Sequence, residues 1–249
     1  MKLTHILSAI ALACSLAISA PAMADDFDTA TAYYEQQNYT QAFPIFKRLA
    51  EQGNADAQYN LGYMYHNGYG VKQDYTQAVS WYRKSAEQGY AKAQNNLGAM
   101  YDEGQGVKQD YGQAISWYRK SAEQGDAEAQ FNLGAMYDEG YGVKQDDQQA
   151  FSWYHKAAQQ GNADAQYNLG NMYGDGRGVR QSHGKAMMWY KKAYEQGKVD
   201  AAYNIAVMYD SGEGVRQNKK EAKEWYGRAC DLGDQEGCDE SKNLVKQGY

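Results

Sequence analysis

The chain has 249 residues and a formal net charge of −6 at pH 7, and its mean hydropathy is −0.84. A hydrophilic, acidic chain is a poor candidate for binding nucleic acid, because phosphate groups need a cationic surface. The chain is unusually aromatic, with 24 tyrosines and 5 tryptophans, and it has 26 glycines but only 2 prolines. This composition predicts many short elements that end at glycine.

Residues 1–24 are predicted to form a secretory signal peptide. Lys2 precedes an apolar run from Ile6 to Ile18, and Ala22-Met23-Ala24 then has the small-residue pattern of a cleavage site. The run is too short for a transmembrane helix. We therefore predict an exported protein, either periplasmic or secreted, whose formal net charge becomes −7 when Lys2 is removed.

The cysteines divide between the leader and the mature chain. Cys14 lies in the leader, whereas Cys230 and Cys238 remain after cleavage. Disulfides persist in the oxidising compartments that exported proteins enter. Lipid anchoring through Cys14 is an alternative, but the Ala11-Leu12-Ala13-Cys14 stretch begins with alanine where a lipoprotein box usually has leucine.

Five segments of the mature chain repeat with a fixed period of 36 residues. A period of this size is typical of stacked supersecondary units. In each segment a tyrosine follows a tryptophan, and a glycine closes the segment. The tryptophans are Trp81, Trp117, Trp153, Trp189 and Trp225, and the glycines that mark the period are Gly53, Gly89, Gly125, Gly161, Gly197 and Gly233.

Each half of a segment is predicted to be an amphipathic helix, because apolar residues recur at offsets of three and four in both halves of residues 54–89. Asn54 and Asp74 are the predicted N-caps of the two helices. The glycines of Gly68-Tyr69-Gly70 end the first helix, and Gly89 ends the second. The unit is therefore a helix, a glycine loop and a second helix.

A single helix pair of this kind cannot bury both apolar faces, so neighbouring pairs are expected to share a core. The predicted fold class is all-α, a right-handed α-solenoid of stacked helix-loop-helix repeats. Glycine recurs in the middle of the first helix, at Gly62, Gly98, Gly134 and Gly170. Because glycine costs a helix interior about 1 kcal/mol relative to alanine, this repetition predicts the close approach of another helix.

The repeated unit resembles a Sel1-like repeat, a relative of the tetratricopeptide repeat. Leu-Gly-x-Met-Tyr, Gly-x-Gly-Val, the Trp-Tyr pair and the closing glycine carry the resemblance. The resemblance implies an α-solenoid adaptor, of a kind that includes secreted bacterial proteins contacting host or envelope proteins. The expected units are a tetratricopeptide-like hairpin at 25–53, five repeats at 54–89, 90–125, 126–161, 162–197 and 198–233, and a polar capping helix at 234–249.

Motifs that could carry catalysis have simpler structural explanations. Gly-Tyr-Gly-Val follows a predicted helix and lacks the third glycine of a phosphate loop, so it is expected to connect two helices. Ser182-His183-Gly184-Lys185 has the S-x-x-K spacing of serine β-lactamases, but the other two motifs of that family are absent from the sequence. Ser182 stands at the register of the helix cap Asp74, so a capping role is expected.

No metal, cofactor or sugar site is expected in the repeats. The Trp-Tyr pairs are predicted to belong to the core between helices rather than to stack on sugars. The histidines of the mature chain occupy different repeat positions, so they do not predict a metal-ligand cluster. They are His66, His155 and His183.

By resemblance to tetratricopeptide units, the first helices are expected to line the concave face of the solenoid. The residues expected there vary among the repeats, whereas the core positions do not. The predicted binding residues are Tyr59, Tyr63, His66, Asn95, Asp102, Glu103, Phe131, Asp138, Glu139, Tyr167, Asn171, Asp175, Tyr203 and Asp210. This aromatic and acidic set has no basic residue on the same register, so it predicts a groove for a segment with basic residues. A solvated acidic face is the alternative.

The sequence therefore predicts a monomeric, non-catalytic scaffold that binds another protein. Two alternatives are open at this point. Weak β-lactam binding or hydrolysis is implied by cysteine-rich relatives of the repeat family. An adaptor of the envelope or peptidoglycan machinery would differ from a host-binding protein only in its partner.

Cys230 and Cys238 lie on either side of Gly233, late in the second helix of the fifth repeat and early in the capping helix. Two predicted helices meet at that bend, so the thiols can approach each other, as they do in the cysteine-rich proteins that the chain resembles. The spacing argues against a redox C-x-x-C pair, and a metal site lacks further ligands nearby. We predict a structural disulfide that clamps the terminal helix.

Overall fold

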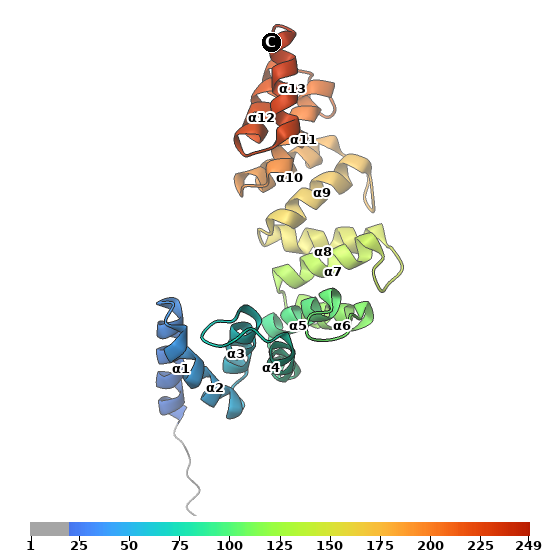
Figure 1. Ribbon diagram of the computed structural model, residues 1–249. Helices are drawn as coiled ribbons and strands as arrows, with labels where there is room; N and C mark the ends of the chain where they lie inside the picture. The colour runs from blue at the N-terminus through green and yellow to red at the C-terminus, as the bar shows by residue number, and fades with distance from the viewer. Residues whose placement is uncertain (1–19) are drawn as a thin grey trace, which may run out of the picture.

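The computed structural model describes residues 20–249, and within that range the chain forms thirteen α-helices and no strand. Each helix packs mainly against its neighbours in the chain, and the helices follow one another from α1 at one end to α13 at the other (Figure 1). The helices are α1 (Ala20–Glu35), α2 (Tyr39–Glu51), α3 (Ala55–Asn67), α4 (Tyr75–Glu87), α5 (Ala91–Glu103), α6 (Tyr111–Glu123), α7 (Ala127–Glu139), α8 (Asp147–Gln159), α9 (Ala163–Asp175), α10 (His183–Glu195), α11 (Val199–Ser211), α12 (Lys219–Asp231) and α13 (Gln235–Lys246). The predicted α-solenoid is confirmed.

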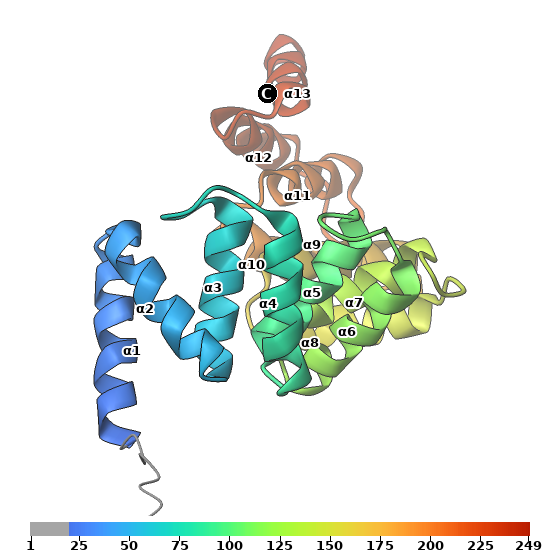
Figure 2. The ribbon, with the colours of Figure 1, turned by 60° about the horizontal axis from the view of Figure 1, so that its bottom comes forward.

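The five repeats correspond to the pairs α3–α4, α5–α6, α7–α8, α9–α10 and α11–α12, numbered first to fifth below. The two helices of a repeat lie side by side, as α3 and α4 do in Figure 2. The shorter pair α1–α2 precedes them and α13 follows them. Both ends of the stack are therefore occupied by elements that differ from a repeat.

Most of the predicted leader lies outside the described residues. Residues 1–19, with Cys14 among them, are not described, and the cleavage motif Ala22-Met23-Ala24 lies in the first turns of α1. Cleavage and export therefore stay predictions.

The helix boundaries follow the predicted capping residues. Oδ1 of Asn54 accepts a hydrogen bond from the backbone N–H of Ala57 at 2.8 Å, and Oδ1 of Asp74 accepts one from Gln77 at 3.0 Å. These bonds satisfy N–H groups that have no partner inside the helix. Gly68, with a φ of 74°, ends α3 in the left-handed region that favours glycine.

The Trp-Tyr pairs belong to the core, as predicted. The tyrosines are buried in every repeat, and Tyr82 and Tyr154 are among the largest fully buried side chains. In the first and third repeats the tryptophan ring lies nearer the surface than the tyrosine, and in all five repeats a cation three residues later lies over the tryptophan ring. Lys84 Nζ lies 3.7 Å from the centroid of the Trp81 ring, a geometry that favours a cation–π interaction.

The mid-helix glycines permit the close approach that their repetition predicted. A Cβ added to Gly62 would lie 2.7 Å from Cδ1 of Tyr82, and one added to Gly134 would lie 2.7 Å from Cδ1 of Tyr154. The tyrosine ring of the second helix thus crosses the backbone of the first helix where no side chain stands. In the fifth repeat, buried Ala206 occupies this position.

Buried glutamines connect each of the first four repeats to the helix pair before it, a role that the sequence did not reveal. Nε2 of Gln58 donates to the backbone oxygen of Ala50 at 3.1 Å, and Nε2 of Gln88 donates to Oε1 of Gln58 at 2.7 Å. The second to fourth repeats have the same chain through Gln94, Gln130 and Gln166. Each of these carbonyls also accepts the backbone N–H of the glycine that closes the preceding helix pair, so the glutamine adds a second hydrogen bond at the end of that helix.

The Gly-x-Gly loops connect helices and also form contacts between repeats. The ring of Tyr141, between two loop glycines, stacks on Tyr111 at the start of the preceding repeat's second helix, with centroids 5.3 Å apart. A Cβ added to Gly142 would lie 2.6 Å from Cβ of Tyr111. In the next repeat Arg177 holds the place of Tyr141, and its Nη1 lies 3.5 Å from Oδ1 of Asp147. The nature of the pair thus changes from repeat to repeat while its position is kept.

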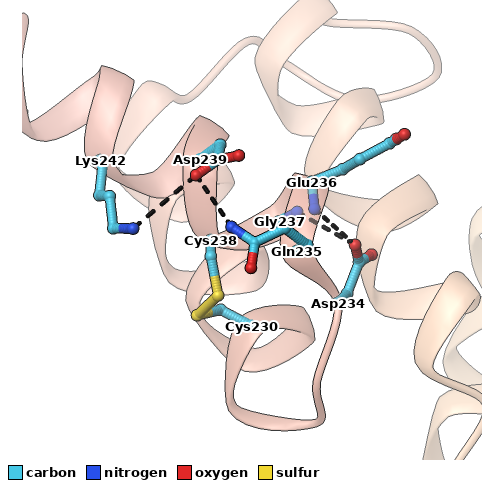
Figure 3. The surroundings of a disulfide bond; sticks show 8 residues. All are labelled: Cys230, Asp234, Gln235, Glu236, Gly237, Cys238, Asp239 and Lys242. Carbon is cyan, nitrogen blue, oxygen red and sulfur yellow. Dashed lines mark hydrogen bonds and ion pairs between the residues drawn. A yellow bond between two sulfur atoms is a disulfide. The ribbon is translucent and has the colours of Figure 1, made fainter.

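A disulfide joins the last two helices. Cys230 of α12 and Cys238 of α13 are bonded, and their Cα atoms lie 4.5 Å apart (Figure 3). Between them, Oδ1 of Asp234 caps α13 by accepting from the backbone N–H groups of Glu236 and Gly237 at 2.9 and 3.2 Å. The predicted pairing is confirmed.

The disulfide replaces a hydrogen bond of the repeat. Five periods of 36 residues place Cys238 at the position of Gln58 and Cys230 at the position of Ala50, the residues that share a hydrogen bond at the first junction. At the last junction the terminal helix has only one neighbour, and a covalent bond holds it there.

Substituting Gly134 by alanine tests the close packing of tyrosine on the first helix. We expect Gly134→Ala to lower the free energy of unfolding by about 1–2 kcal/mol, since overpacking outweighs the gain in helix propensity. Gly184→Ala is the control, because no atom lies within 4 Å of its added Cβ, and it should raise stability. Urea denaturation followed by circular dichroism measures both, and an equal gain in the two variants would contradict the packing account.

Reducing the disulfide should release α13 and leave the repeats intact. A closed loop of this size stabilises by about 2–3 kcal/mol in the chain-entropy model, and the terminal helix is the one that depends on it. Hydrogen exchange with and without reductant, read by mass spectrometry, should show faster exchange confined to residues 229–249. Unchanged exchange there, or faster exchange throughout α3–α9, would argue against this role.

Candidate binding groove

The predicted groove residues lie on the first helices of the five repeats. Hydrogen bonds join neighbouring first helices through this set: Asn132 of α7 donates to Asn95 of α5 at 3.0 Å, and Asn204 of α11 donates to Asn171 of α9 at 3.4 Å. These contacts bring the set into a row across the repeats. Most members are half-buried, and the exposed ones are Glu103, Glu139 and Asp175.

The asparagines that donate in this row were not among the predicted residues. They occupy one position that is identical in all five repeats: Asn60, Asn96, Asn132, Asn168 and Asn204. The sequence did contain a signal for them, because one polar residue is identical at this helix position in all five repeats. Such a residue indicates a structural contact between repeats. The variable residues beside it remain the candidates for recognition.

Tyrosine hydroxyls from the second helices reach the same row. Three of them donate to first-helix acceptors: Tyr118 to Oδ2 of Asp102 at 3.3 Å, Tyr154 to Oδ2 of Asp138 at 3.4 Å, and Tyr190 to Oδ1 of Asn171 at 2.7 Å. Burial raises the pKa of Asp102, and the hydrogen bond from Tyr118 lowers it. Three predicted groove residues are therefore also tied to the core.

Three acidic residues of the set, Asp138, Asp175 and Asp210, form ion pairs with basic side chains, and Nε of Arg177 lies 3.9 Å from Oδ2 of Asp175. Arg177 comes from the loop of the fourth repeat, and its Nη1 lies 2.6 Å from Oδ1 of Asp138. Lys219, the first residue of α12, places Nζ 2.6 Å from Oδ1 of Asp210. Neither basic residue stands on the register of the set, because a register along one helix does not include the loops and second helices that supply Arg177 and Lys219.

The remaining acidic charge of the row gathers in the second and third repeats. Within residues 26–249, no basic side chain forms an ion pair with Asp102, Glu103 or Glu139. Glu103 and Glu139 are also exposed. Their charge is therefore available to a partner.

The first-repeat end of the row is aromatic instead. The ring centroids of Tyr59 and Tyr63 lie 6.3 Å apart, and those of Tyr63 and Tyr69 lie 6.2 Å apart. Tyr69 in turn stacks on Tyr39 at 4.4 Å. The row thus changes along its length from tyrosine-rich to acidic.

Two of the hollows on the row are each lined by two predicted groove residues, and a third, of about 130 Å³, is lined by one, Asp175. One lies between α3 and α5 and has a volume of about 240 Å³; its lining is Tyr63, His66, Asn67, Tyr82, Asn96 and Ala99. The other, of about 570 Å³, lies toward the C-terminal end, and Tyr167, Tyr203 and Glu236 are among its lining residues. Predicted groove residues contribute to both.

The other candidate motifs have structural roles. The hydroxyl of Ser182 accepts a hydrogen bond from the backbone N–H of Lys185 at 3.4 Å, so the S-x-x-K serine caps α10. The ring of His155 lies 6.0 Å from that of Trp189. Among residues 20–249, no three His, Cys, Asp or Glu side chains gather as metal ligands, and no helix of that range has the length and apolar character needed to cross a membrane.

Comparison with known proteins shows several structures of the same kind. A crystal structure of c5321, described as a protective antigen of uropathogenic Escherichia coli with an SLR fold, is 41% identical with a TM-score of 0.81; the match covers 83% of this chain and 44% of c5321. A Sel1 repeat protein from Oxalobacter formigenes is 33% identical, with a TM-score of 0.82 and 90% of each chain covered. One from Klebsiella pneumoniae is 25% identical, with a TM-score of 0.52, 80% of this chain and 97% of that one covered. No curated protein matches.

The family model for the Sel1 repeat matches six times, over residues 30–54, 55–90, 91–126, 127–162, 163–198 and 199–234. The first match falls on the α1–α2 hairpin and the other five on the 36-residue repeats. The matched segments cover most of the chain, and both the fold and the spacing of the repeats agree with them. The chain belongs to the Sel1 repeat family.

Proposed function

We propose that this protein is an exported, non-catalytic scaffold, periplasmic or secreted, that binds another protein through the row of first-helix side chains described above. The Sel1 repeat is compatible with protein–protein interaction. The cysteine pair, which lies at bonding distance, is consistent with an oxidising compartment. The description of c5321 as a protective antigen is in keeping with export, although this chain spans less than half of that protein.

The observation that carries the proposal is the unpaired acidic charge of the second and third repeats. Exposed Glu103 and Glu139 stand one repeat apart, as the last residues of α5 and α7. Exposed carboxylates without a basic partner in the protein suit a segment with lysine or arginine, because opposite charges attract. The partner is therefore a protein segment with basic residues, extended or helical.

A charge reversal on the row tests the proposal. Glu103→Lys with Glu139→Lys should weaken partner binding by at least tenfold, since like charges then face the basic segment. Glu87→Lys with Glu123→Lys is the matched control, because these exposed residues end α4 and α6 and make the same change in net charge. A partner is first identified by crosslinking and mass spectrometry, and binding is then measured by calorimetry at two salt concentrations. Equal affinity of both double variants would show that the row is not the binding surface.

A further inference from the structure

The first repeat departs from the hydroxyl pairing of the second, third and fourth repeats. Tyr82 is 0% exposed, and its hydroxyl has no hydrogen-bond partner within residues 26–249. The equivalent hydroxyls of Tyr118, Tyr154 and Tyr190 all donate to acceptors on their own first helices. Buried polar groups without partners are rare in folded proteins and destabilise them, so the exception needs an explanation.

The explanation lies in two substitutions on α3. The residue four positions after the mid-helix glycine is Asp102 or Asp138 in the next two repeats, but His66 in the first. The acceptor of the fourth repeat, Asn171, corresponds to Tyr63. The first repeat therefore has no first-helix carboxylate or amide oxygen at the positions that its neighbours use.

The hollow of about 240 Å³ lies at this place. Tyr82, His66 and Asn96 all line it, and each carries an N–H or O–H group that can donate. Burial raises the pKa of the Tyr82 hydroxyl, while the side chain of Asn96 lowers it. No acceptor lies within hydrogen-bond distance of the hydroxyl in residues 26–249.

The residues that line the hollow include no carboxylate. Burial lowers the pKa of His66, and Glu103 on α5 raises it. The ring of His66 packs edge-on against Tyr75 at 5.3 Å, so it is held at the wall. An incoming carboxylate would meet hydrogen-bond donors here, whereas in the second and third repeats it would meet Asp102 and Asp138.

We propose that the hollow between α3 and α5 binds an acidic side chain, aspartate or glutamate, of the partner segment, whose carboxylate takes the place that Asp102 and Asp138 hold against the tyrosines of the next two repeats. This inference rests on the proposed function and adds a direction to it. The partner segment would present an acidic residue to the first repeat and basic residues to the second and third. It would therefore bind in one orientation.

Small probes test the hollow without the partner. The mature chain is titrated with N-acetylglutamate α-methylamide, and the ring signals of His66 and Tyr82 are followed by NMR. We expect saturable shifts of both rings with the glutamate probe, and at least tenfold weaker binding of the neutral isostere N-acetylglutamine methylamide. Equal binding of the two probes, or no shift of the Tyr82 ring signals, would overturn the assignment to an acidic side chain. Binding of N-acetylglycine without binding of the glutamate probe would overturn it as well.

Two exchanges between repeats sharpen the test. His66→Asp installs the acceptor that the second and third repeats have, and it should abolish probe binding at Tyr82. Asp102→His removes that acceptor from Tyr118, and it should create a second site that is seen in the ring signals of Tyr118. Probe binding that survives His66→Asp unchanged would contradict the proposal.

Stability provides a readout that needs no ligand. Tyr82→Phe removes a hydroxyl without a partner, so the Tm should stay the same or rise. Tyr154→Phe removes one that donates to Asp138, so the Tm should fall by about 2–4 °C. An equal fall in both variants would show that Tyr82 already has a partner inside the protein. If these tests fail, the proposed binding of a basic segment by the acidic residues is unaffected. If the charge reversal at Glu103 and Glu139 has no effect, the binding of the glutamate probe at the hollow still stands.

Discussion

The structure depends on one contact that recurs in the repeats, the crossing of a tyrosine ring over a helix glycine. Because Gly98 has no side chain, the ring of Tyr118 lies against the backbone of α5, and its hydroxyl reaches Asp102 one turn later. A single geometry therefore packs the two helices of a repeat and delivers a phenol to the face where a partner would bind. Under the proposed function, this position couples burial to recognition, because the residue opposite the hydroxyl either accepts its hydrogen bond or leaves that bond to a ligand.

The same logic explains why the contacts between repeats vary in kind but not in place. A glutamine–carbonyl hydrogen bond joins the early repeats, and a disulfide stands at the same register at the last junction. The loop contacts change from stacked tyrosines to an arginine–aspartate pair. In a solenoid each unit touches only its neighbours, so one junction can exchange its chemistry without disturbing the next.

Much of the fold could be predicted from the sequence because the same residue pattern recurs every 36 residues. The helix pairs, the caps at Asn54 and Asp74, the close approach at Gly62 and the cysteine pair all follow from local pattern repeated at a fixed spacing. Contacts made by residues outside the helix register could not be predicted from the sequence. Arg177 reaches Asp138 from a loop of the next repeat, and no spacing along α7 could have shown it. The unpaired hydroxyl of Tyr82 was hidden for a related reason, since its tyrosine is common to all five repeats and only the residue opposite differs.

The central claim is that the first helices, and not the second, face the partner. Site-specific photocrosslinking in the organism's own cells tests this most directly, with the photoreactive residue at position 103 on α5 or at position 123 on α6, both of which are exposed. We predict that position 103 captures a partner whose crosslinked peptide contains lysine or arginine beside the attachment point, and that position 123 captures none. Capture of the same partner from position 123 alone would contradict the account.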